Sequence, residues 1–249
     1  MFEETLMSFT MDSKFLDSPL NFEGISQALE LRRFILSDVH PELKADSSTD
    51  KKRRDLFDIM RGDGERSVIV TSSLRRAIST TTLAFWPRIN KSGEKIFVLS
   101  SLQEISRNVD TVALSKAKEV ADLPFARLTP HCSPSTGSIF NPDAVYDTSE
   151  NFGNKTRSFY GGKRLTSFNE WVFQRDEPVI IAGGHSLWFK NYFLTYMPHL
   201  VQHDAKSKKI TNSGAVSFTI SRAEDAEGAA QYRIDPNSIE VLYGGFTTK

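Results

Sequence analysis

The chain has 249 residues, of which 39% are hydrophobic and 25% are charged, a composition typical of a globular protein and not of a disordered one. Lysine plus arginine and aspartate plus glutamate both number 31, so the formal net charge is zero. This balance argues against a nucleic-acid binder or a membrane-surface binder, because both need a net cationic face. A small basic pocket is compatible with it.

The single cysteine, Cys132, excludes an intramolecular disulfide and favours a reducing compartment. No apolar run approaches the roughly 20 residues that span a membrane. Segment 1–11 has no basic residue ahead of an apolar stretch, so it resembles neither a secretory signal nor a transit peptide. We therefore expect a cytoplasmic protein.

The first predicted element is a helix over 25–36, where apolar residues recur at helical spacing. Residues 40–55 are polar and contain the basic run 51–54. We interpret this run as a solvated loop edge that leads into a helix over 56–60. A nuclear-localisation or polyanion-binding role for the run is the less favoured interpretation.

A β-branched run predicts a buried strand over 68–70, and helical spacing follows over 74–86. Another strand is expected over 97–99. The stretch 124–165 is rich in proline, glycine, serine and threonine, which predicts a long excursion with little regular structure.

A helix is predicted over 167–173, then a strand over 179–182 and a helix over 187–196. Alternating apolar residues predict two more strands, over 216–220 and 239–243.

Strands that alternate with helices predict βαβ units and a mainly parallel sheet with helices on both faces. We therefore expect an α/β fold, a three-layer α/β/α sandwich that forms a single domain over residues 1–249. In such sheets ligands bind beyond the carboxyl ends of the strands. Two strand-to-helix turns, 71–77 and 183–187, are the places to look for a site.

The first of these turns carries hydroxyl side chains, followed by Arg75 and Arg76 in the first helical turn. A helix N-terminus favours anions, and an arginine adds a planar fork that matches phosphate oxygens. Either arginine alone is more simply explained as a surface residue. Because an arginine is unfavourable beside a helix N-terminus, one of the two is expected to have a function.

The second turn places His185 after a buried strand and a Gly-Gly pair, where its side chain can donate to a phosphoryl oxygen. A structural histidine is the more common alternative. Glu104 closely follows the strand at 97–99 and is a candidate general acid or base. Its simpler alternative is a capping charge.

Five segments, in this order along the chain, resemble those of the histidine phosphatase superfamily, of the phosphoglycerate mutase type. They are Asp17-Ser18-Pro19-Leu20 with Gly24 and Gln27, the turn 71–80 with Ser73 where the family has proline, Leu102-Gln103-Glu104, Gly184-His185-Ser186, and 209–213. Each segment is weak alone, and their order makes the set specific.

The resemblance implies that Arg76 clamps phosphate, that His185 is the second histidine of the pocket and that Glu104 is the general acid. The residues implied to bind or select the substrate are Arg76, Ser73, Arg107 and Asp110. It implies no cofactor, and the sequence has no cluster with metal-ligand spacing. The expected partner is a phosphorylated small molecule or a phosphoprotein, with no nucleic acid and no membrane.

The family's reaction also needs an Arg-His-Gly turn after the first strand, whose histidine attacks the phosphoryl group. Only sixteen residues precede Asp17, and none of them is histidine or arginine. The favoured interpretation is a sequence that begins downstream of the true start, since 3–16 resembles the acidic-apolar segment that follows this turn. The alternative is a pseudoenzyme that retains part of the phosphate pocket.

In the family, the strand that carries this turn lies between the strands matching 68–70 and 179–182. Its loss leaves backbone groups unpaired or forces the two neighbours together. Segment 5–11 is a less favoured substitute for that strand.

We therefore expect a phosphomonoester phosphatase or mutase-like protein that works through a phosphohistidine in the full-length family and lacks the nucleophile in this chain. The alternative is a catalytically inactive module that binds a phosphate ligand or a partner. A serine hydrolase is disfavoured, because Gly184-His185-Ser186 is not a Gly-x-Ser-x-Gly elbow.

Overall fold

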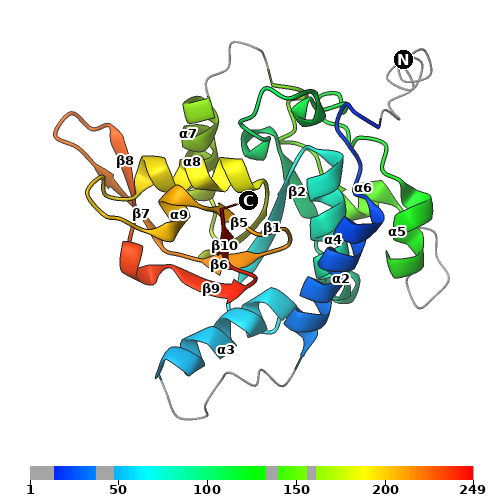
Figure 1. The fold of residues 1–249 in the computed structure, drawn as a ribbon, viewed down its shortest axis with the longest axis horizontal. Coiled ribbons are helices and arrows are strands. Elements are labelled where there is room, and N and C mark those ends of the chain that lie inside the picture. Colours follow the sequence, from blue (N-terminus) through cyan, green and yellow to red (C-terminus); the bar gives the residue numbers. More distant parts are fainter. Residues whose placement is uncertain (1–13, 38–47, 133–139, 156–160, 249) are drawn as a thin grey trace.

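A parallel sheet of four strands, in the order β3-β2-β1-β4, lies at the centre of the structure (Figure 1). The structure is a computed structural model that describes residues 14–37, 48–132, 140–155 and 161–248. The strands are β1 (Ser67–Ser72), β2 (Ile96–Leu99), β3 (Tyr146–Asp147) and β4 (Val179–Gly183). β1, β2 and β4 contain the predicted strands at 68–70, 97–99 and 179–182.

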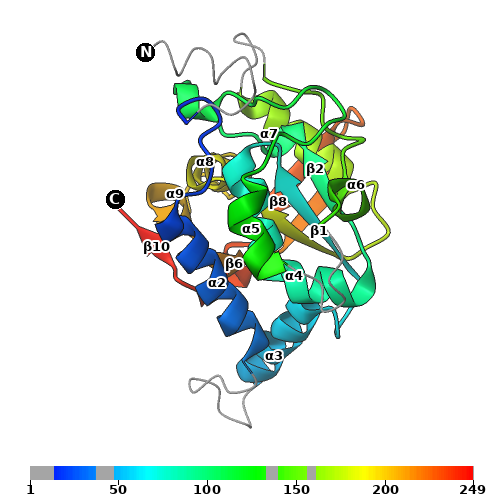
Figure 2. The same cartoon turned by 90° about the vertical axis from the view of Figure 1, so that its right-hand side faces the viewer.

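Successive side chains of β1 pack on opposite faces of the sheet. Ile69 belongs to an apolar cluster with residues of α2 (Phe22–Leu36) and α4 (Arg75–Ser92). Val68 and Val70 belong to a second cluster with residues of α7 (Gly161–Val172) and α8 (Ser186–Tyr196). Figure 2 shows α2, α4 and α5 together on one side of β1 and β2. This arrangement confirms the three-layer α/β/α sandwich.

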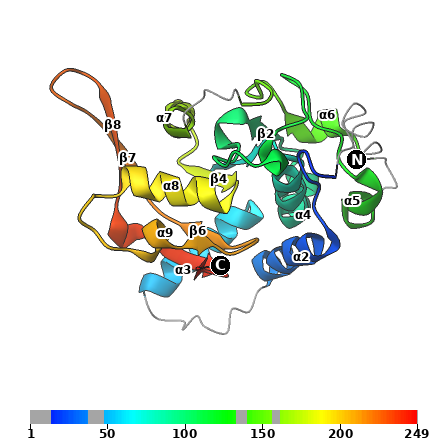
Figure 3. The same ribbon diagram turned by 45° about the horizontal axis from the view of Figure 1, so that its top comes forward.

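The C-terminal part forms short antiparallel pairs outside the parallel sheet. The pairs are β5 (Lys209–Ile210) with β10 (Phe246–Thr247), β6 (Ala215–Ser217) with β9 (Glu240–Tyr243), and β7 (Ile220–Glu224) with β8 (Ala230–Ile234). The short helix α9 (Asp204–Ser207) precedes them. The β7–β8 hairpin extends away from the sheet beside α8 (Figure 3). The predicted strand at 216–220 is divided in the structure between β6 and the start of β7, and the predicted strand at 239–243 corresponds to β9. The strands β5, β8 and β10 were not predicted.

Helix α3 (Ser48–Arg61) corrects the expected loop at 40–55. It begins eight residues before the predicted start at residue 56, so the basic run 51–54 is helical. Lysine and arginine are good helix formers, and Phe57 and Met60 anchor the helix in the core. Residues 40–47 lie outside the described residues.

The excursion at 124–165 also contains more regular structure than predicted. Within it are α5 (Phe125–Cys132), α6 (Pro142–Val145), β3 and the start of α7. Leu128, Cys132 and Tyr146 pack in the apolar core. This tertiary packing stabilises short elements that the amino-acid composition of the stretch does not favour. The prediction was wrong for these elements, and its parts at 133–139 and 156–160 lie outside the described residues.

β1 pairs directly with β4, from Ser67 opposite Val179 to Thr71 opposite Gly183. Among the described residues no strand lies between them, so β1 and β4 are direct neighbours. Segment 5–11, considered as a substitute, lies outside the described residues. The carboxyl ends of β1, β2 and β4 consequently meet at one edge of the sheet. Among the described helices, none combines the length and apolarity needed to cross a membrane.

Candidate functional site

Arg75, the first residue of α4, is buried and holds the segment ahead of α2 in place. Its backbone N–H donates to Asp17 Oδ1 over 2.8 Å, and its Nε donates to the Asp17 carbonyl over 2.7 Å. Nη2 donates to the Leu16 carbonyl over 3.2 Å. Asp17 also accepts from the Leu114 N–H over 3.1 Å. These contacts make Arg75 a structural anchor.

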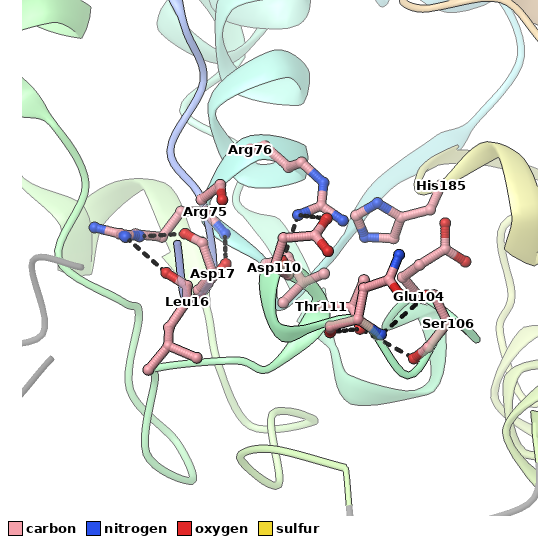
Figure 4. A network of polar contacts seen from close by, with 12 residues as sticks. Leu16, Asp17, Arg75, Arg76, Glu104, Ser106, Asp110, Thr111 and His185 are labelled. Carbon is pink, nitrogen blue, oxygen red and sulfur yellow. Dashed lines mark hydrogen bonds and ion pairs between the residues drawn. The ribbon is translucent and has the colours of Figure 1, made fainter. Parts of the chain in front are cut away.

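Arg76 faces another direction, toward His185 (Figure 4). Its Nη1 donates to the Asp110 carbonyl over 2.6 Å and lies 3.5 Å from Asp110 Oδ2. The side chain is 24% exposed, so the guanidinium stays accessible to a ligand. Of the two arginines, Arg76 is therefore the one placed to meet an anion.

His185 follows the end of β4, and two glycines permit the turn. A Cβ at Gly183 would lie 1.9 Å from Thr81 Oγ1, so only glycine lets β4 approach α4 this closely. The Nε2 atom of His185 lies 2.8 Å from Ser72 Oγ. Burial holds the pKa of His185 well below its ordinary value of 6.5, and positive charge from Arg76 lowers it further. The imidazole is therefore neutral at pH 7.

Glu104 lies close after β2, beyond the short turn Ser100–Leu102. Its Oε1 accepts from the Ile105 N–H over 2.7 Å. Burial raises the pKa of this carboxyl above its ordinary value, and the positive charges of Arg76 and Lys155 oppose part of the rise. A carboxyl of this kind retains its proton to higher pH than an exposed one, as a general acid requires.

Two further cations, Lys155 and Arg164, lie beside Glu104, and the sequence did not indicate them. Lys155 Nζ donates to the carbonyls of Glu104 and Ser106, both over 2.6 Å, and to Thr111 Oγ1 over 2.9 Å. Arg164 Nη2 donates to the Glu104 carbonyl over 3.3 Å. Burial, together with the nearby charge of Arg164, lowers the pKa of Lys155 to about 8. No motif surrounds either residue, so pattern reading had no signal to use.

Arg76, Glu104 and His185 line one cavity of about 950 Å³. The structure therefore brings these three predicted residues together. Ser73 is buried, and its hydroxyl has no hydrogen-bond partner among the described residues. Arg107 is exposed and is not one of the residues that line the cavity.

No group of three or more His, Cys, Asp or Glu side chains within the described ranges is arranged to hold a metal ion. Among the polar groups that line the cavity are thus an arginine, a buried carboxyl and a neutral imidazole. Such a set can bind an anion and supply a proton.

No protein-family model matches the chain, and no curated protein matches it. The chain is similar to solved structures that include two mycobacterial proteins. The chain is 14% identical to a mycobacterial glucosyl-3-phosphoglycerate phosphatase, with 88% of each chain covered and a TM-score of 0.41. It is 16% identical to a mycobacterial hydrolase, with 93% of this chain and 89% of the other covered and a TM-score of 0.42.

Proposed function

We propose that the cavity binds a phosphomonoester and that the chain is a phosphatase or mutase-like member of the histidine phosphatase superfamily. The observation that carries the proposal is the convergence of Arg76, Glu104 and His185 where the carboxyl ends of β1, β2 and β4 meet. Ligands of parallel α/β sheets bind at this edge. The five family-like segments of the sequence support the same assignment.

Each residue has a role that follows from its state. The planar fork of Arg76 binds two phosphate oxygens, and the positive charge offsets the charge of the ester. Neutral His185 donates one N–H to a third oxygen without adding a buried charge. Glu104, with its raised pKa, gives its proton to the leaving oxygen as the P–O bond breaks.

These three residues do not provide the nucleophile that attacks the phosphoryl group. In the superfamily a histidine accepts the phosphoryl group and water or a second alcohol removes it. At the cavity the described residues offer one histidine, His185, which is the hydrogen-bonding one. We propose that turnover requires a histidine from upstream of these 249 residues.

A second candidate function is phosphate-ligand binding without turnover. The direct pairing of β1 with β4 favours it, because no described strand lies between them to present a second histidine. The two functions share the anion site and differ in the chemical step alone.

Hydrolysis of p-nitrophenyl phosphate separates the two functions. The 249-residue chain and a chain extended upstream by its natural coding sequence are compared, with phosphate binding measured for both. The proposal predicts binding by both proteins and nitrophenol release by the extended chain only. Binding without release by either protein indicates the second function. A folded chain that binds no phosphate refutes both.

A further inference from the structure

Strand β4 is an edge strand of the described sheet, although it is apolar along nearly its whole length. It pairs with β1 on one side, and residues 179–182 are Val, Ile, Ile and Ala. All five of its residues are only half-buried, whereas β1 is buried from Val68 onward. A continuous apolar run is typical of a strand covered on both faces. β4 thus has apolar surface that the described residues do not cover.

This surface faces the cavity that contains the polar site. The other walls include Leu56 and Met60 of α3 and Ala215 and Val216 of β6. The volume of about 950 Å³ lies within the range of small-molecule sites. The five residues of β4 extend over roughly 16 Å, and the polar group lies at the carboxyl end of the strand. The cavity therefore has the polar group of Arg76, Glu104 and His185 at the carboxyl end of β4 and a long apolar wall along the strand, and Arg175 and Glu177 line it ahead of the strand.

We propose that the substrate is an amphiphilic phosphomonoester, with its phosphate at Arg76 and an extended apolar chain along β4. The inference rests on the proposed function for the phosphate end. A chain along β4 removes the apolar wall from water, and the phosphate meets the guanidinium and the imidazole. One molecule of this chemistry satisfies both the polar group and the apolar wall along β4.

An extended peptide is the competing occupant, since a free strand edge can add another strand. The peptide backbone would pair with the backbone of β4, but this pairing places no anion at Arg76. The shared cavity of Arg76, His185 and the apolar wall favours the amphiphile.

Calorimetric titration of inorganic phosphate, butyl phosphate and octyl phosphate into the 249-residue chain tests the inference, below the concentrations at which these esters form micelles. Each fully buried methylene is expected to tighten binding about fourfold. Octyl phosphate has four more methylenes than butyl phosphate, so it should bind up to about 250-fold more tightly if all four are buried and more than about tenfold more tightly if two are. Equal affinities for the two esters overturn the inference and leave phosphate binding intact. If inorganic phosphate itself fails to bind, the proposed function fails.

Val216 of β6 and Leu194 of α8 supply a pair of variants, one at the cavity and one away from it. Val216 lines the cavity, whereas Leu194 is exposed and does not line it. Val216→Asn should weaken octyl phosphate binding several-fold and leave inorganic phosphate unchanged, and Leu194→Asn should change neither. If both variants bind octyl phosphate like the wild type, the chain does not lie along this wall and the inference is wrong.

Discussion

Arg75 and Arg76 are neighbours at the start of α4, yet they belong to different regions of the molecule (Figure 4). Arg75 is 1% exposed, and its guanidinium donates to the carbonyls of Asp17 and Leu16. Arg76 is partly exposed and faces the cavity beside His185. The same residue type thus anchors the fold on one side of the helix and is available for an anion on the other.

The difference shows what a buried arginine needs. A desolvated guanidinium is stable only when several acceptors surround it, and Arg75 has them from two segments far apart in sequence. Among the described residues, Arg76 has one hydrogen-bond and ion-pair partner, Asp110, and its side chain is partly exposed. Burial and the number of acceptors distinguish the anchor from the arginine that is available for an anion.

The largest expected effect is on stability, from the anchor. Arg75→Leu leaves the carbonyls of Leu16, Asp17 and Asp122 without their side-chain donor. It also removes the positive charge beside the buried Asp17 carboxyl, so it should lower the free energy of unfolding by about 3–5 kcal/mol. Arg76→Leu should change it by less than about 1 kcal/mol, because its ion pair is partly exposed. Urea unfolding measures both. Similar losses in the two variants would contradict the comparison.

A smaller effect is expected at the loop that carries Glu104. Lys155→Met removes three donated hydrogen bonds from residues 104–111 and should destabilise the protein by about 2 kcal/mol. It should also weaken phosphate binding, because the loop positions Glu104. Lys118→Met, on an exposed lysine outside the site, is the control for both measurements. Unchanged stability would show that the lysine does not hold the loop.

The smallest effect is a pH dependence from His185. Its pKa is lower in the folded protein than in the unfolded chain, so below pH 6.5 the unfolded state binds a proton that the folded state rejects. Stability from this group is therefore complete above pH 6.5 and is lost as the pH falls, by up to about 1.4 kcal/mol per pH unit. Glu104, with a raised pKa, acts in the opposite direction.

Comparison with His185→Asn isolates the histidine, because Glu104 is present in both proteins. The variant should lose less stability than the wild type between pH 6.5 and 5.5, as measured by urea unfolding at each pH. Parallel curves would mean that His185 titrates normally in the folded state.

The sequence predicted the elements that have an uninterrupted apolar or helical pattern over several consecutive residues. β1, β4 and α8 have continuous apolar runs or clear helical spacing, and glycines mark the turn to His185. β3 has two residues and no periodicity, so its pairing with β2 was invisible. The start of α3 was hidden by its charges, which resemble a loop.

Strand ends and motif order predicted that Arg76, Glu104 and His185 lie together, and all three line the same cavity. Lys155 and Arg164 come from the excursion and from α7, and only the folding of these segments against Glu104 gives them a place in the site. The Asp17–Arg75 anchor likewise joins residues 58 positions apart and needs the structure to be seen.

Titration of inorganic phosphate into three proteins tests the central claim most directly: the wild-type chain, Arg76→Ala, and Arg66→Ala. Arg66 is an exposed arginine just before β1, at the opposite end of the sheet, and serves as the matched control. Arg76→Ala should weaken binding by at least about tenfold, since a charge-assisted bond contributes about 1.5–3 kcal/mol, while Arg66→Ala should bind like the wild type. Equal binding by Arg76→Ala and the wild type would contradict the account.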